Sequence, residues 1–322
     1  MSAPAPAPAP APAPGIVLGD VEIIRLIEWS GPVRTARFIV PDSDEETWRR
    51  NEDWLAPDFW TPADDAYRCH VQTFVLRSEG RTILVDTGIG NGRDRPQVPQ
   101  FAHLRTDFLD RLRAAGVEPE DVDVVVNTHI HYDHVGWNTR WLDGQWVPTF
   151  PHATYLVPRA DHRYFDPAGP GPGGGRAPRD DHERVRWEGS RLVFEDSIAP
   201  VERAGQLVLW EDRHRIDGNL LLEAAPGHTP GSSALTLRSG ADRAVFVGDM
   251  LHSPVQVLEP EWNSCFCDDV RLAANTRRAF LARAADLGEL VVPAHWPGHS
   301  AAEIRPRGDG FAIKEWAAFP RA

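Results

Sequence analysis

The sequence predicts a protein of mixed α-helix and β-strand structure, on three observations. Short β-branched and apolar runs bounded by turn residues are typical of buried strands, and 121–127 (DVDVVVN) is one of them. Apolar residues recur at helical spacing over 101–112, and Gly116 follows as a stop signal. A long helix is predicted at about 269–287, with an acidic start and Gly288 at its end.

The remaining elements are predicted from alternating apolar patterns and from glycine and proline positions. Segments 21–29 and 33–40 are expected to form two strands joined by a turn at Gly31 and Pro32. Other predicted elements are a hairpin at 70–76 and 81–86, a strand at 153–157, a helical turn at 161–165, and strands at 207–210, 220–224, 233–237 and 244–247.

Composition restricts the partners of the chain. Its formal charge is -13, from 34 Lys plus Arg against 47 Asp plus Glu, which argues against binding of nucleic acid or of an anionic membrane surface. No run approaches the roughly 18 apolar residues that a membrane-spanning helix needs. The three cysteines, Cys69, Cys265 and Cys267, form no disulfide framework and are expected to be reduced. We therefore expect a cytoplasmic protein with a small-molecule substrate.

The domain organisation follows from composition. Residues 1–15 are an Ala-Pro repeat, expected to be a disordered, polyproline-like tail without the features of a signal peptide. Residues 16–322 are expected to form a single domain. Within it, the aromatic segment 42–66 is either a cap on the core or a lid over an apolar substrate pocket, and 166–180 is a flexible, Pro/Gly-rich loop.

Four metal-binding side chains stand within six positions directly after the strand predicted at 121–127. His129 and His131 occupy alternate positions, so in an extended segment both can reach one ion. Asp133 and His134 come after the bend and can face a second ion. Imidazole and carboxylate ligands suit zinc and, with less selectivity, manganese, iron or cobalt. A two-metal site is therefore predicted.

Other predicted strands also end in candidate ligands. His228 lies in the tight turn 226–231 (PGHTPG), Asp249 follows a strand in VGD, and His295 follows another in PAH. Asp86, in VDTG, is either a ligand or a carboxylate that accepts a hydrogen bond from a ligand histidine.

With these motifs the chain resembles the metallo-β-lactamase-fold hydrolases over nearly its whole length after residue 15. The resemblance implies a four-layer αββα sandwich with a dinuclear site at one edge, and it implies that Asp86 is not a ligand. It also implies that one metal is held by His129, His131 and His228, that the other is held by Asp133, His134 and His295, and that Asp249 bridges them.

Within this family the chain is most similar to the group that contains methyl parathion hydrolase and the acyl-homoserine lactonases. The similarity lies in 134–138 (HVGWN), 249–252 (DMLH) and 293–298 (PAHWPG). Members of that group act on lactones, esters and phosphotriesters. The zinc β-lactamases generally have cysteine at the position of Asp249, so antibiotic hydrolysis is not expected.

The implied chemistry is hydrolysis by a hydroxide shared between two ions about 3.5 to 4 Å apart. Asp249 and Asp133 would accept or relay a proton. His252 would contact the substrate or donate a proton to the leaving group, with a packing role equally open. Five tryptophans are candidates to line the substrate pocket: Trp54, Trp60, Trp137, Trp262 and Trp296.

Other functions stay open at this point. A thioester hydrolase of the glyoxalase II type shares the ligand set, but no basic substrate-binding domain follows His295. A tRNA-processing nuclease also shares this ligand set, but the acidity of the chain argues against binding of nucleic acid. A mononuclear iron oxygenase acting on persulfides would use a subset of the ligands, and a silent metal-binding protein is the last alternative. A homodimer, with the aromatic segment 42–66 as interface, is possible by resemblance.

Overall fold

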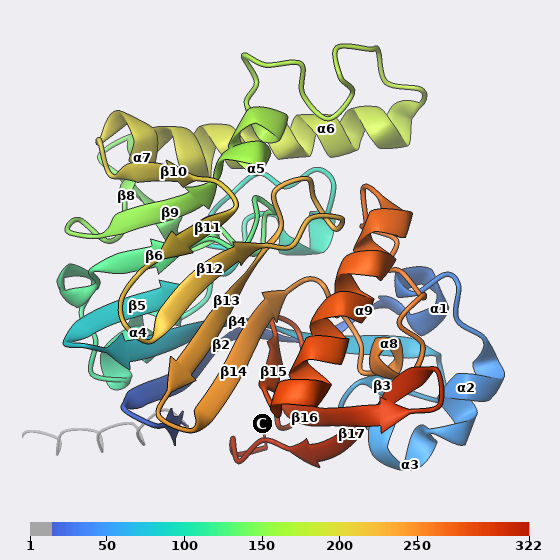
Figure 1. Ribbon diagram of the computed structural model, residues 1–322. Coiled ribbons are helices and arrows are strands. Elements are labelled where there is room, and N and C mark those ends of the chain that lie inside the picture. The colour runs from blue at the N-terminus through green and yellow to red at the C-terminus, as the bar shows by residue number, and fades with distance from the viewer. Residues whose placement is uncertain (1–14, 322) are drawn as a thin grey trace, which may run out of the picture.

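The computed structural model describes residues 15–321 and contains two large β-sheets with helices on their outer faces (Figure 1). The predicted tail lies outside the described residues except for Gly15, which begins β1. Strand order in the first sheet is β1-β2-β4-β5-β6-β9-β10, with β3 beside β4. Its strands are β1 (Gly15–Leu18), β2 (Val21–Thr35), β3 (Trp60–Thr61), β4 (Ala66–Ser78), β5 (Arg81–Val85), β6 (Val124–Val126), β9 (Thr154–Pro158) and β10 (Leu207–Trp210).

The second sheet has its strands in sequence order, and a separate hairpin joins β7 (Thr139–Leu142) to β8 (Gln145–Pro148). Its strands are β11 (Arg213–Arg215), β12 (Leu220–Ala224), β13 (Ser233–Ser239), β14 (Asp242–Gly248), β15 (Leu290–Pro293), β16 (Ala302–Arg307) and β17 (Gly310–Trp316). The α-helices are α1 (Ala36–Ile39), α2 (Glu45–Arg50), α3 (Glu52–Leu55), α4 (Phe108–Ala114), α5 (Arg159–Phe165), α6 (Asp181–Val193), α7 (Ala199–Arg203), α8 (Val255–Leu258) and α9 (Val270–Leu287).

Alternation along the strands divides the interior into layers, because successive side chains point to opposite faces of a sheet. Ile23 of β2 packs between the two sheets with Phe246 of β14. The next residue, Ile24, joins the outer layer with Phe108 of α4. On the far side of the second sheet, Leu281 of α9 belongs to a further apolar layer. The αββα order of layers is confirmed.

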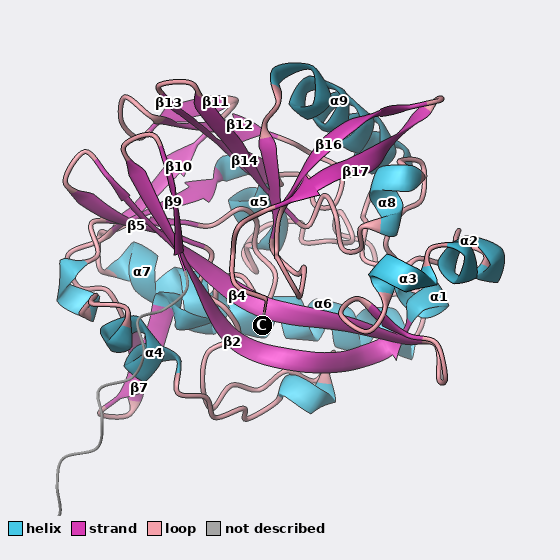
Figure 2. Cartoon of the chain, turned by 90° about the horizontal axis from the view of Figure 1, so that it is seen from below, coloured by secondary structure: helices cyan, strands magenta, loops and turns pink. Residues whose placement is uncertain are grey.

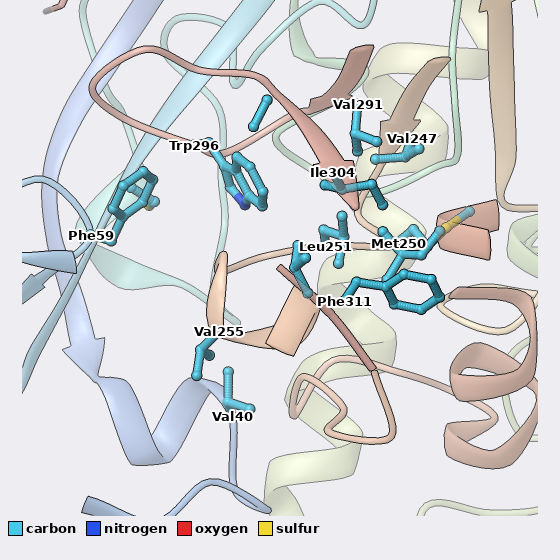
Figure 3. Packing of buried hydrophobic residues seen from close by; sticks show 14 of the residues in the cluster. Val40, Phe59, Val247, Met250, Leu251, Val255, Val291, Trp296, Ile304 and Phe311 are labelled. Carbon is cyan, nitrogen blue, oxygen red and sulfur yellow. The ribbon is translucent and has the colours of Figure 1, made fainter. Parts of the chain in front are cut away.

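The aromatic segment after β2 packs into the core. Trp48 and Trp60 are almost completely buried, and the ring of Phe59 meets that of Trp296 edge-on with centroids 6.0 Å apart. Figure 3 shows Phe59 and Trp296 in one cluster with Val40. These contacts favour the core cap over the lid. The buried rings are also not free to form the expected homodimer interface, and the homodimer stays a prediction.

One predicted turn is wrong. Gly31 and Pro32 lie within β2, which runs unbroken to Thr35 beside β4 (Figure 2), and 36–39 is helix α1 instead of strand. The register between β2 and β4 shifts between Pro32 and Arg34, and β1 pairs only with the first residues of β2. Proline is tolerated there because its missing N–H faces an unpaired edge.

Helix α9 begins and ends where the sequence predicts. The Asp269 side chain accepts a hydrogen bond from the backbone of Leu272 at 2.9 Å, and Gly288 ends the helix in the left-handed conformation with φ 64°. By contrast, helix α6 and the hairpin of β16 and β17 were not predicted. Within residues 15–321, no helix combines the length and apolarity needed to cross a membrane.

Candidate metal centre

The candidate ligands lie where strands of the two sheets end. Strands β5 and β6 are parallel, as are β14 and β15, so the carboxyl ends of each pair meet at one edge of their sheet. Asp86 directly follows β5, and the segment 127–134 follows β6. Asp249 directly follows β14, and His295 comes two residues after β15.

Three histidines gather around one oxygen of Asp249. The Nε2 atoms of His129 and His228 each lie 3.0 Å from Nδ1 of His131. Asp249 Oδ2 is 3.2 Å from Nε2 of His228 and 3.7 Å from Nε2 of His129. These four donor atoms lie within 4.8 Å of one another and form the three-histidine group.

The second group faces the other oxygen of the same carboxylate. Asp249 Oδ1 is 2.9 Å from Nε2 of His295 and 3.2 Å from Nε2 of His134. Asp133 completes this group, with its oxygens 3.6 Å from His295 Nε2 and 3.8 Å from His134 Nε2. Asp249 therefore stands between the two groups with one oxygen toward each.

The donor set fits divalent metal ions. Nε2 of His134 and Oδ1 of Asp249 are buried and have no hydrogen-bond partner among the described residues. Such atoms are costly unless another group satisfies them, as a bound cation would. Burial and neighbouring imidazoles also hold the pKa values of His129 and His131 well below the usual range. Both rings are therefore neutral at pH 7, the form that binds metal.

In three of the ligand histidines, the nitrogen that faces away from the centre is held by a protein group. Nδ1 of His134 lies 2.8 Å from Asp86 Oδ2, and Nδ1 of His295 lies 2.8 Å from the carbonyl oxygen of His70. Nδ1 of His129 lies 3.1 Å from the hydroxyl of Thr128. Such contacts fix the ring orientation and the tautomer of a ligand.

Asp86, which directly follows β5, contacts the ligand-bearing segment that follows β6. Besides His134, it accepts hydrogen bonds from the backbone N–H and the hydroxyl of Thr128, at 2.8 and 2.9 Å. It adopts a left-handed backbone with φ 57°, uncommon outside glycine. Its oxygens are thus engaged by Thr128 and by the outer side of His134, and the metal-facing atom of His134 is left free.

His252 lies at the edge of the centre. Its Nε2 is 3.3 Å from Asp249 Oδ2, and its ring lies 5.7 Å from that of Phe266. The hydroxyl of Tyr67 donates to the backbone carbonyl of His252 at 2.7 Å. The side chain is 4% exposed. Its ring thus contacts Asp249 and Phe266, and a role in contacting the substrate or protonating the leaving group stays a prediction.

All five candidate pocket tryptophans pack in or against the hydrophobic layers. Trp60 and Trp296 are buried in the α9 layer, and Trp54 lies beside Trp316 with the two rings tilted and their centroids 6.2 Å apart. Trp137 stacks on Phe108. Trp262 is half-buried against the α9 layer. These contacts are core packing, and a role in binding substrate stays a prediction.

Two contacts around the ligands were not predicted from the sequence. Cys267 Sγ lies 3.9 Å from Nδ1 of His228, and all three cysteines are free. Asp161, at the start of α5, hydrogen-bonds to both histidine-bearing loops. A thiol or carboxylate outside any motif gives no sequence signal for such a contact.

A family model described as the metallo-beta-lactamase superfamily matches residues 66–295, which is more than half of the chain. The chain belongs to the metallo-β-lactamase superfamily. The family assignment made from the ligand motifs is thereby confirmed. The matched range includes every candidate ligand of this metallo-β-lactamase-like centre, from His129 to His295, and also Asp86.

Among curated proteins, this superfamily member is 30% identical over 131 residues to the N-acyl homoserine lactonase AttM of Rhizobium radiobacter. The match covers 40% of this chain and 41% of AttM. The gamma-lactamase FDB1 of Fusarium pseudograminearum is 28% identical over 163 residues, which cover 46% of this chain and 33% of that protein. The chain thus spans about two fifths of the length of AttM.

Comparison with solved structures extends the likeness to nearly the whole fold. The hydrolase AbOPH superposes with a TM-score of 0.76 at 22% identity, covering 97% of this chain and 99% of AbOPH. AidC, a dizinc quorum-quenching lactonase, superposes with a TM-score of 0.71 at 21% identity, covering 96% of this chain and 98% of AidC. At these identities the likeness establishes the fold.

Proposed function

We propose that this chain is a dinuclear metal-dependent hydrolase of lactones, esters or phosphotriesters. The observation that carries the proposal is Asp249, whose two oxygens face two separate groups of metal-binding atoms. The names of AttM and AidC, both lactonases, support the substrate class. Zinc is the preferred ion for this set of imidazole and carboxylate ligands.

In this proposal the three-histidine group with Asp249 holds one ion, and the second group, Asp133, His134 and His295, holds the other. When bound, two divalent ions lower the pKa of a shared water and polarise the carbonyl or phosphoryl oxygen. Asp249 sets the separation of the groups, and Asp133, whose oxygens lie 3.6 Å from His295 and 3.8 Å from His134, can accept a proton from the attacking water. His252 holds Asp249 through the 3.3 Å contact.

The test is metal content per chain of protein purified without added metal, combined with a substrate panel. The panel contains an aryl ester, a long-chain acyl lactone, a phosphotriester and a glutathione thioester. We expect close to two ions per chain, turnover of at least one of the first three substrates, loss of activity on chelation and recovery with Zn²⁺. One iron per chain without hydrolysis would overturn this proposal and favour the persulfide oxygenase, which oxygen uptake would then single out. Turnover of the thioester alone would favour the glyoxalase II type.

Asp86→Asn is expected to lower the affinity of the second group for its ion about 10- to 100-fold. The amide cannot accept hydrogen bonds at both of its terminal atoms, so either Thr128 or the Nδ1 of His134 loses its partner. Stepwise Zn²⁺ affinities, measured against a chromophoric chelator, give the effect. Unchanged affinity for both ions would contradict the role given to Asp86.

A further inference from the structure

Asp161 joins the two loops that carry the three-histidine group. It lies in the first turn of α5 and is completely buried. Its Oδ2 accepts hydrogen bonds from the backbone N–H of Ile130 and from the hydroxyl of Thr229, both at 2.9 Å. Its Oδ1 accepts from the backbone N–H of Gly231 at 2.6 Å. Both oxygens are thus occupied by donors from these loops.

The three donors are neighbours of the ligands in sequence. Ile130 stands between His129 and His131, and Thr229 directly follows His228. The loops are about a hundred residues apart in the chain, and each is short and bounded by a strand. Ser233 also joins them, because its backbone N–H donates to the carbonyl of Thr128 at 3.0 Å. Asp161 adds the contacts beside the histidines themselves.

The approach of the loop to Asp161 requires glycine at position 231. A Cβ atom at Gly231 would lie 2.5 Å from the backbone nitrogen of Asp161 and 2.7 Å from its Oδ1, closer than atoms can pack. The second glycine of the PGHTPG turn therefore has a specific partner. The turn and the carboxylate form one fitted contact, which fixes where His228 is presented.

The charge of Asp161 is balanced by hydrogen bonds. Among residues 15–321 no lysine, arginine or histidine forms an ion pair with it. Burial raises the pKa of Asp161 to about 6, and the hydrogen bonds from Ile130, Thr229 and Gly231 oppose this shift. At neutral pH the side chain is therefore a carboxylate, able to accept all three hydrogen bonds at once.

We propose that Asp161 is the positioning residue of the three-histidine group, and that it sets the affinity of this group for its ion. Asp86 serves the second group, since its Oδ2 contacts Nδ1 of the ligand His134 directly. The two carboxylates thus act on different halves of the centre. This inference rests on the dinuclear site proposed above.

The decisive variant is Asp161→Asn, which keeps the shape of the side chain but replaces one accepting oxygen by an NH₂ group. At least one buried donor then loses its partner. We expect Zn²⁺ binding at one site to weaken about 10- to 100-fold and binding at the other to stay unchanged. Stepwise dissociation constants come from titration of metal-free protein against a chromophoric chelator.

The double variant with Asp86→Asn shows which ion is affected. If the two carboxylates serve different groups, each single variant lowers the affinity for one ion, and the double variant lowers the affinity for both. If both single variants weaken the same ion, the double variant retains one ion at wild-type affinity, and the assignment of Asp161 to the three-histidine group is wrong.

Thr229→Val removes one of the three donors to Asp161 with little change of shape. It is expected to lower the affinity for the same ion by a smaller factor. If Asp161→Asn does not fold, Thr229→Val decides: wild-type affinity for both ions overturns the role of Asp161. Two tightly bound ions in Asp161→Asn overturn that role and leave the proposed function intact. A wild-type protein that binds fewer than two ions overturns the dinuclear site itself.

Discussion

Asp249→Ala is expected to lower turnover of every hydrolysed substrate by at least about a thousandfold. Asp249 is the residue whose two oxygens approach both groups, at 3.2 Å from His228 and 2.9 Å from His295. Alanine removes a ligand of both ions and also their common negative charge. Five imidazoles would then face one another without the bridging carboxylate. The measurement is kcat/KM together with metal content per chain.

His131→Ala is the matched test of one group alone, because Nδ1 of His131 contacts only the three-histidine group. We expect this variant to lose one ion and nearly all turnover. The control is Asp110→Ala, which removes a carboxylate that is 80% exposed and paired with Arg113 on α4. It should leave activity and metal content unchanged. A rate near that of the wild type in Asp249→Ala would contradict the dinuclear mechanism.

The positions of the candidate ligands could be predicted because they combine two signals. Each stands at or shortly after the end of an apolar strand, and each is a residue type that binds metal. His295 shows this: 291–294 reads as a buried strand end, and β15 ends at Pro293. Local sequence specifies such sites because the fold brings strand ends to one edge.

Other features depend on partners distant in sequence. Gly31 and Pro32 carry the local signal of a turn, but pairing with β4 along the whole of β2 outweighs it. Helix α6 has charged residues at six of its 13 positions and buries only Glu183, Gly189 and Val193, so it shows little apolar periodicity. Asp161 has partners 31 to 70 residues away and belongs to no motif.

Proximity in sequence is also a poor guide to where a side chain lies. Trp296 directly follows His295, which suggests a shared pocket. His295 lies in a bend just after the end of β15, however, and the two side chains enter different surroundings. His295 faces Asp249, while Trp296 is completely buried against Phe59. A tryptophan beside a ligand is therefore as well suited to the core as to the substrate pocket.

Away from the metal centre, one buried carboxylate, Asp196, is expected to contribute strongly to the free energy of unfolding. It lies on a π-helical turn (Phe194–Ile198) between α6 and α7. Its oxygens pair with the Nη1 atoms of Arg93 and Arg95, each at 2.7 Å, and both arginine side chains are completely buried. Burial lowers the pKa of Arg93 to about 10, so this side chain remains charged at neutral pH.

Asp196→Ala is therefore expected to lower the free energy of unfolding by about 3 to 5 kcal/mol, because it leaves two buried cations without a counter-charge. The neighbouring Glu195 provides the control: its pair with Arg191 is 46% exposed on both sides. Glu195→Ala should change stability by less than about 0.5 kcal/mol. Urea unfolding of the metal-free variants measures both. Equal midpoints for the two variants would show that Asp196 does not hold the arginines in place.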